Sequence, residues 1–234
     1  TIRPPQPGFR VTIGGKDATI PAGSGQRLKV NLERIDNFSG PVRVDIENLP
    51  EGYTVSSPIV VEAGHLEAEG VLHADPKASS LDKANWDKVR ITATAEVQGK
   101  TVSRNVGNLG HIKLGPKPKV LVQLTPDPRY GSSEEIRLAP GETITAMISI
   151  ERNGFEGELK FDVDNLPHGV IVDNIGLSGV LIRKGESQRQ IFLTAEDWVP
   201  ESNRLIHAVA KGAGNQASRP IRFQVKNAEL QTRN

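Results

Sequence analysis

Residues 38–55 read FSGPVRVDIENLPEGYTV, and residues 155–172 read FEGELKFDVDNLPHGVIV. When the two stretches are aligned without gaps, 8 of 18 positions are identical. The identical pairs are Phe38/Phe155, Gly40/Gly157, Asp45/Asp162, Asn48/Asn165, Leu49/Leu166, Pro50/Pro167, Gly52/Gly169 and Val55/Val172. Self-similarity at a fixed offset indicates a duplicated structural unit, so we expect two homologous domains.

The similarity continues on both sides of this stretch. Upstream, residues 20–23 (IPAG) correspond to residues 138–141 (LAPG), and residues 32–34 (LER) correspond to residues 150–152 (IER). Downstream, residues 72–75 (LHAD) correspond to residues 193–196 (LTAE). The repeat therefore predicts one domain over residues 1–115 and a second over residues 119–234.

The segment between the two repeats has the composition of a short linker. Residues 114–119 read LGPKPK, in which Pro116 and Pro118 alternate with lysines. Each proline removes a backbone donor and restrains φ, so the segment is expected to be extended and semi-rigid.

Within each repeat the apolar residues recur with a period of two. Val42, Val44 and Ile46 alternate with polar residues, and the second copy repeats this pattern at residues 159–163. This period is typical of an antiparallel strand with one face in the core. The best helical candidate is short, at residues 78–86. Such strands between frequent turn signals predict an all-β chain of two antiparallel β-sandwiches with about seven strands each.

The motif residues of the repeat are those that turns and close packing require. Proline presets φ and glycine tolerates positive φ, so residues 48–52 and 165–169 are predicted turns. We expect the following residues to be structural: Phe38, Gly40, Asn48, Leu49, Pro50, Gly52, Phe155, Gly157, Asn165, Leu166, Pro167 and Gly169.

The composition excludes several classes of function. The 234 residues contain 29 Lys plus Arg against 28 Asp plus Glu, which gives a net charge of +1 and no basic excess for nucleic acid. Because cysteine is absent, disulfides, thiolate metal sites and cysteine nucleophiles are excluded. No apolar run is long enough to insert into a membrane, and residues 1–5 show no signal-peptide core.

The pattern F-x-G-x-V-x-V-x-x-x-N-L-P-x-G-V, preceded by an apolar-Glu-Arg strand, resembles bacterial immunoglobulin-like accessory domains. Such domains occur in tandem in large secreted or surface proteins. The resemblance implies an immunoglobulin-like fold in both repeats, an extracytoplasmic location and no enzymatic activity or cofactor. The implied partners are neighbouring domains of the parent protein or a surface protein, with polysaccharide as an alternative.

Two carboxylate pairs are the candidates for a metal or acid–base site. Asp162 and Asp164 lie two residues apart on one predicted strand, as do Asp45 and Glu47 in the first repeat. Side chains at this spacing share a face about 7 Å apart, a separation compatible with calcium binding or glycoside hydrolysis. The competing interpretation is a solvated sheet face, because basic residues are interleaved with both pairs. The five histidines have no spacing typical of zinc.

Trp86 and Trp198 are the candidates for ligand binding. Each precedes the late core strand of its repeat and has polar neighbours, which suggests a loop on which a sugar ring could stack. Alternatively, each ring closes the end of its sandwich. We therefore expect a non-catalytic spacer or protein-binding module, with a carbohydrate-binding module as the alternative.

Overall fold

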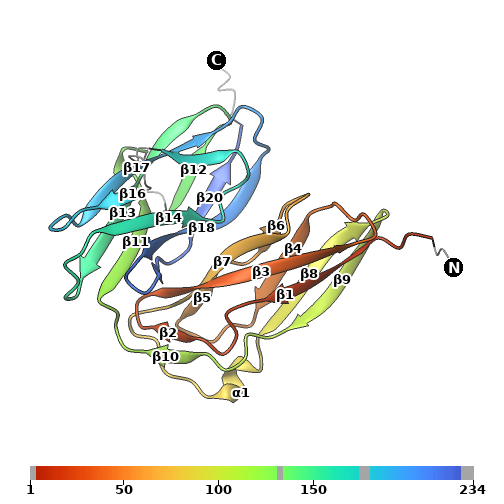
Figure 1. The fold of residues 1–234 in the computed structure, drawn as a ribbon, viewed down its shortest axis with the longest axis horizontal. Helices are drawn as coiled ribbons and strands as arrows, with labels where there is room; N and C mark the ends of the chain where they lie inside the picture. Colours follow the sequence, from red (N-terminus) through yellow and green to blue (C-terminus); the bar gives the residue numbers. More distant parts are fainter. Residues whose placement is uncertain (1–3, 131–133, 174–179, 228–234) are drawn as a thin grey trace, which may run out of the picture. The chain divides into compact units, whose positions relative to one another are not determined.

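The computed structural model describes residues 4–130, 134–173 and 180–227. The chain divides into two compact units, Thr1–Pro118 and Lys119–Asn234 (Figure 1). Among the described residues, no helix has the length and apolar character needed to cross a membrane.

The described residues of the first unit form ten strands and one helical turn. In chain order they are β1 (Gly8–Ile13), β2 (Thr19–Pro21), β3 (Gly25–Ile35), β4 (Val42–Glu47), β5 (Tyr53–Val55), β6 (Ile59–Val61), β7 (Glu67–Ala74), α1 (Lys83–Trp86), β8 (Arg90–Val97), β9 (Lys100–Gly107) and β10 (Lys113–Gly115). The expected helix at residues 78–86 is thus a single turn, which the Asp82 side chain caps by accepting a hydrogen bond from the backbone N–H of Asn85.

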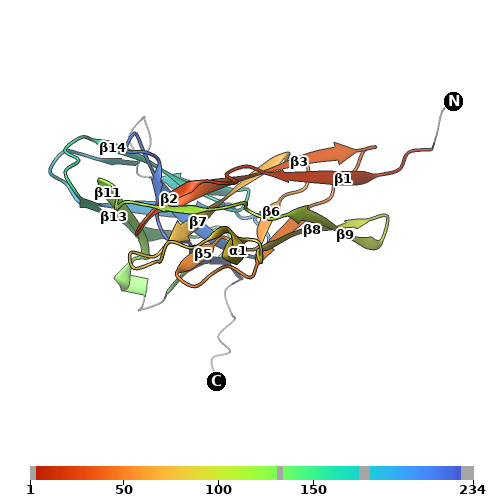
Figure 2. The ribbon, with the colours of Figure 1, turned by 90° about the horizontal axis from the view of Figure 1, so that it is seen from below.

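These strands form two facing antiparallel sheets. One sheet has the order β1-β3-β7-β5, and the other has the order β6-β4-β8-β9. Figure 2 shows β1 and β3 in one layer and β8 and β9 in the other. A third pairing joins β10 to β2 in parallel.

The second unit repeats this plan. Its elements are β11 (Val120–Pro126), η1 (Pro128–Tyr130), β12 (Glu135–Leu138), β13 (Thr143–Arg152), β14 (Leu159–Asp164), β15 (Val170–Asp173), β16 (Val180–Ile182), β17 (Gln188–Ala195), β18 (Ser202–Lys211), β19 (Gln216–Ala217) and β20 (Ile221–Val225). The sheet β11-β13-β17-β15 matches β1-β3-β7-β5 strand for strand. Facing it, β16, β14, β18 and β20 are followed by β12, which pairs with β20 in parallel.

The alternation seen in the sequence places every second side chain between the sheets. In β4 the buried residues Val42, Val44 and Ile46 face a core that also contains Ile91 and Ala93 of β8. The second unit has a core of its own, which includes Leu159 and Phe161 of β14. The prediction of two immunoglobulin-like sandwiches is confirmed. The described residues hold ten strands per unit rather than about seven because several short strands, such as β5 and β6, add to the sheets.

Candidate functional site

Arg34, at the end of β3, holds two loops of the first unit. Its Nη1 donates to the carbonyl oxygen of Gly40 at 2.7 Å, and its Nη2 donates to that of Glu62 at 2.7 Å. Its Nε donates to the carbonyl of His65 at 3.0 Å. One planar guanidinium therefore satisfies carbonyls from the β3–β4 and β6–β7 loops. Desolvation by this partial burial lowers the pKa of Arg34 from its ordinary value.

Arg152 makes the same set of contacts in the second unit. Its Nη1 donates to the carbonyl of Gly157 at 2.8 Å, its Nη2 to that of Arg183 at 2.9 Å and its Nε to that of Glu186 at 3.1 Å. We call Arg34 and Arg152 with these carbonyls the arginine clamps. The alignment of the two repeats places Arg34 opposite Arg152 but does not predict a role for either. The signal that could have indicated a shared role is their common position, directly after a glutamate at the end of a strand.

The clamps account for Phe and Gly in the repeated motif. A Cβ added to Gly40 would lie 3.1 Å from the ring of Phe38, and one added to Gly157 would lie 2.7 Å from the ring of Phe155. The guanidinium carbon of Arg34 lies 5.4 Å from the centre of the Phe38 ring. Each glycine thus leaves room for a ring that packs beneath the clamped loop.

The motif Asn-Leu-Pro-x-Gly forms a tight turn in the first unit. Asn48 has φ 61° and Gly52 has φ 81°, both in the left-handed region that these residue types tolerate. The N–H of Tyr53 donates to the carbonyl of Pro50 at 3.3 Å, and the N–H of Asp75 donates to that of Gly52 at 2.8 Å. The turn therefore joins the start of β5 to the end of β7.

The second unit repeats this turn with the same bonds. The N–H of Val170 donates to the carbonyl of Pro167 at 3.0 Å, and the N–H of Glu196 donates to that of Gly169 at 3.0 Å. The Nδ2 of Asn165 adds a bond of 2.9 Å to the carbonyl of Leu205. Leu49 and Leu166 both pack against the core of their own unit.

The candidate metal ligands Asp162 and Asp164 are already engaged by basic side chains. Asp162 forms an ion pair of 2.7 Å with Lys211, and Asp164 lies 3.4 Å from Nε2 of the buried His207. In the first unit, Asp45 pairs with Arg43 at 2.7 Å. Basic side chains thus lie beside these carboxylates, as on the solvated sheet face that was the competing interpretation, and a cation at Asp162 and Asp164 stays a prediction.

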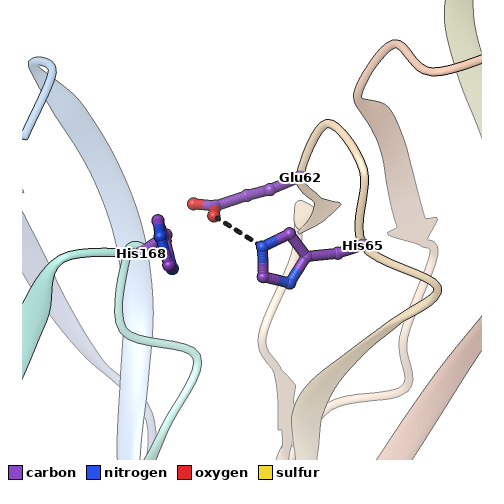
Figure 3. A group of neighbouring side chains, drawn as sticks. All are labelled: Glu62, His65 and His168. Carbon is purple, nitrogen blue, oxygen red and sulfur yellow. Dashed lines mark ion pairs between the residues drawn. The ribbon is translucent and has the colours of Figure 1, made fainter.

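The half-buried Glu62 and the exposed His65 form a pair on the turn between β6 and β7 (Figure 3). The Nε2 of His65 lies 4.0 Å from Oε2 of Glu62, and the N–H of His65 donates to the carbonyl of Glu62 at 3.1 Å. His168, also labelled there, belongs to the second unit and packs beside Trp198. The pair alone offers too few ligands to define a cation site.

Asp127, between β11 and η1, accepts hydrogen bonds from three side chains of the second unit. It accepts hydrogen bonds from Arg129 Nη2 at 2.7 Å, Thr145 Oγ1 at 2.6 Å and Gln190 Nε2 at 2.9 Å. The bonds from Arg129, followed by the bond from Thr145, hold the pKa of Asp127 far below its ordinary value. This carboxylate is structural, since its lone pairs point at donors of its own unit.

Trp86 is fully buried, and the prediction that it is a ligand platform is wrong. Its ring meets the ring of Tyr53 edge-on, with centres 4.8 Å apart and an interplanar angle of 79°. The polar neighbours in the sequence point outward from the single turn of α1, while the indole points inward. Trp86 therefore closes the end of the first sandwich.

Trp198 has the opposite environment. Its side chain is 58% exposed, and its ring centre lies 5.3 Å from the ring of His168. The next residue, Val199, is buried and anchors this loop in the core. Trp198 is thus the one of the two candidate tryptophans that presents its indole to solvent.

Comparison with known proteins finds neither a matching family model nor a matching curated protein. The chain is similar to solved structures of tandem β domains. The fibronectin(III)-like modules of Clostridium thermocellum CbhA are 16% identical, with 96% of this chain and 98% of that chain covered and a TM-score of 0.28. Domains 4 and 5 of the S-layer protein SbsC are 12% identical, with 94% and 98% covered and a TM-score of 0.32. The immunoglobulin-like fold follows from the strand pairing within each unit, and similarity at this level assigns no function.

Proposed function

We propose that the chain is a non-catalytic spacer of a larger extracytoplasmic bacterial protein, built from two immunoglobulin-like modules that resist tension. The observation that carries this proposal is the parallel pairing of an early and a late strand in each unit. In the first unit Ile20 of β2 is in register with Leu114 of β10, and in the second Ile136 of β12 is in register with Phe223 of β20.

Parallel neighbours near the entry and exit of a domain resist stretching. Tension that draws the chain before β2 away from the chain after β10 acts along both strands in opposite directions. Bonds between parallel strands lie across that direction, so they are loaded together rather than one after another. The bonds at this site include those from the N–H of Lys113 to the carbonyl of Ala18 at 2.9 Å and from the N–H of Ala22 to that of Gly115 at 3.2 Å.

The repeated residues support a structural role rather than a chemical one. Arg34 and Arg152 donate to backbone carbonyls, and the Asn-Leu-Pro turns join strands of the same sandwich. The contribution of these residues to the stability of each unit is enough to explain why both copies share them. A spacer needs this property in every module.

Single-molecule stretching between the chain ends tests the proposal. Because the chain has no cysteine, one cysteine added at each end gives a unique handle. We expect two abrupt unfolding steps, each releasing about 40 nm at ~3.6 Å per extended residue. A smooth extension at low force would contradict a load-bearing role.

The exposed indole of Trp198 favours a second candidate, carbohydrate binding by the second unit. An exposed ring beside His168 offers an apolar face of the kind on which a sugar stacks. A glycan array with the wild-type chain and Trp198→Ala tests this function. Leu66→Ala is the control, since Leu66 is 60% exposed and lies in the first unit. Saturable binding that only Trp198→Ala removes would support this candidate, and absence of binding would refute it.

A further inference from the structure

Strand β9 is an open edge of its sheet. It pairs with β8 on one side, and no other strand in the described part of the chain pairs with its outer side. Gln98 and Gly99 link the strands with φ of 51° and 73°, the two-residue turn in which Val97 and Lys100 form the closing hydrogen-bonded pair. Along an antiparallel pair, hydrogen-bonded and non-hydrogen-bonded residue pairs alternate. Counted from Lys100, the residues of β9 that do not bond β8 through their backbone are Thr101, Ser103 and Asn105. Their N–H and C=O groups therefore point away from β8.

The corresponding strand of the second unit is much shorter. Because Arg90 pairs with Glu47 and His207 with Asp164, β18 corresponds to β8, and the strand beside the end of β18 is β19 (Gln216–Ala217). It pairs with β18 over two registered pairs, whereas β9 is eight residues long. An edge of this length is therefore found in the first of the two described units.

A groove runs beside this edge. Its volume is about 400 Å³, and it is lined by Phe9, Val11, Ile35, Val106, Arg10 and Arg104. The apolar residues come from the ends of β1, β3 and β9, where the two sheets of the sandwich part. A strand that paired with the outer side of β9 could place alternate side chains in this groove.

The positive charge of β9 favours an acidic partner. Lys100 and Arg104 lie on β9, whose sequence KTVSRNVG contains no acidic residue. The guanidinium carbon of Arg104 lies 5.3 Å from the centre of the Phe9 ring, so this charge is held over the groove. Arg10 is compensated by Glu33 at 2.7 Å, but no ion pair is found for Arg104 among the described residues.

The same charges disfavour a second copy of this chain as the occupant. Antiparallel pairing of two β9 strands would bring Lys100 and Arg104 of one copy against those of the other, and like charges opposite one another are destabilising. A segment with carboxylates at alternate positions would meet these charges favourably.

We propose that β9 and its groove bind an extended acidic segment of a partner protein by strand addition. The outward backbone groups of Thr101, Ser103 and Asn105 supply the hydrogen bonds. Apolar side chains of the segment enter the groove beside Phe9, and its carboxylates face Arg104 and Lys100. This binding site is independent of the load-bearing role proposed above, so either proposal can fail without the other.

Titration of the isotopically labelled full chain with two synthetic decapeptides tests this site. One peptide alternates valine with glutamate and threonine, and in the other lysine replaces glutamate. We expect saturable binding of the acidic peptide below about 1 mM. Amide signals of Thr101, Ser103 and Asn105 are expected to shift, and their hydrogen exchange to slow, as the edge becomes paired.

Two variants and one control separate strand addition from surface attraction. Ser103→Pro removes an outward N–H and no backbone bond to β8, although it also removes the bond of 3.0 Å between the hydroxyls of Ser103 and Thr94. Arg104→Glu reverses the groove charge. Each variant is expected to weaken binding about tenfold or more. Lys77→Glu makes the same charge change in an exposed loop of the same unit and is expected to leave binding within about twofold. Dispersed amide spectra confirm that each variant is folded.

Three results of the peptide titrations would overturn the proposal. These are no saturable binding of the acidic peptide, equal affinity for the lysine peptide, and signal changes that map away from β9. Equal weakening by Lys77→Glu and Arg104→Glu would also overturn it, because only general charge would then be involved.

Discussion

The Nη1 atom of Arg34 donates a hydrogen bond of 2.7 Å to the carbonyl oxygen of Gly40, which fixes the loop between β3 and β4. Arg152 and Gly157 repeat this relationship at 2.8 Å in the second unit. Residues only six and five positions apart therefore explain why Arg, Phe and Gly recur in both copies. Each clamp uses groups from one unit, so its energetic effect should be confined to that unit.

Replacement of a clamp arginine is expected to destabilise one unit only. Arg34→Met leaves backbone carbonyls at Gly40, Glu62 and His65 without their donor, and the expected loss is about 2 kcal/mol of unfolding free energy. Urea unfolding followed by Trp86 emission, in a Trp198→Phe background, measures the first unit. Arg152→Met is the matched control and should leave this transition unchanged. A shift of equal size from both variants would contradict local clamps.

The two tryptophans are expected to differ sharply in their contribution to stability. Trp86→Ala removes a fully buried ring and should cost about 3–5 kcal/mol. Trp198→Ala removes a ring that is 58% exposed and should change stability by less than about 0.5 kcal/mol. Thermal unfolding monitored by circular dichroism checks both values. A large loss from Trp198→Ala would indicate that this ring is a core residue.

Asp127→Asn is expected to destabilise the second unit in a pH-dependent way. Because the folded state depresses the pKa of Asp127, the carboxylate stabilises the unit fully above its ordinary value of about 3.9. This contribution is lost as the pH falls below that value toward the folded-state pKa. The difference in unfolding free energy between wild type and variant should thus be constant from about pH 5 to 8 and shrink below about pH 4. A difference that grows on acidification would contradict the assignment.

The motif asparagines are expected to respond differently to glycine. Asn48 has φ 61°, so Asn48→Ala should cost about 1 kcal/mol while Asn48→Gly should be nearly neutral. Asn165→Gly additionally loses the bond to the carbonyl of Leu205 and should cost about 1 kcal/mol. Chemical unfolding of the three variants provides the measurement. Equal losses from Asn48→Gly and Asn165→Gly would show that the side-chain bond has no net effect.

Most of the fold could be predicted from local patterns. The alternation of apolar and polar residues at 42–46 predicts a strand because one face of the sheet lies against the core and the other faces solvent. Residues 48–52 predict a turn because the backbone dihedral angles of the turn favour those residue types. The short strands β5 and β6 carry three residues each, too few for a periodic signal.

The candidate sites were harder to predict because they depend on long-range contacts. Trp86 lies in a stretch with polar neighbours, yet its environment is set by Tyr53, which is distant in the sequence. The arginine clamps bind carbonyl groups, which every residue carries, so no partner residue type marks them. Likewise, β9 is an edge strand because no other described strand pairs with its outer side. The sequence of β9 itself does not indicate whether such a partner strand exists.

A pair of proline variants tests the load-bearing role most directly. Lys113→Pro removes the N–H that donates to the carbonyl of Ala18 in the first unit, and Lys226→Pro removes the one that donates to the carbonyl of Leu138 at 3.0 Å in the second. In single-molecule stretching between the chain ends, we predict that each variant lowers the unfolding force of one of the two steps and leaves the other at its wild-type value. Unfolding forces unchanged by both substitutions would contradict the claim that the parallel strand pairs bear the load.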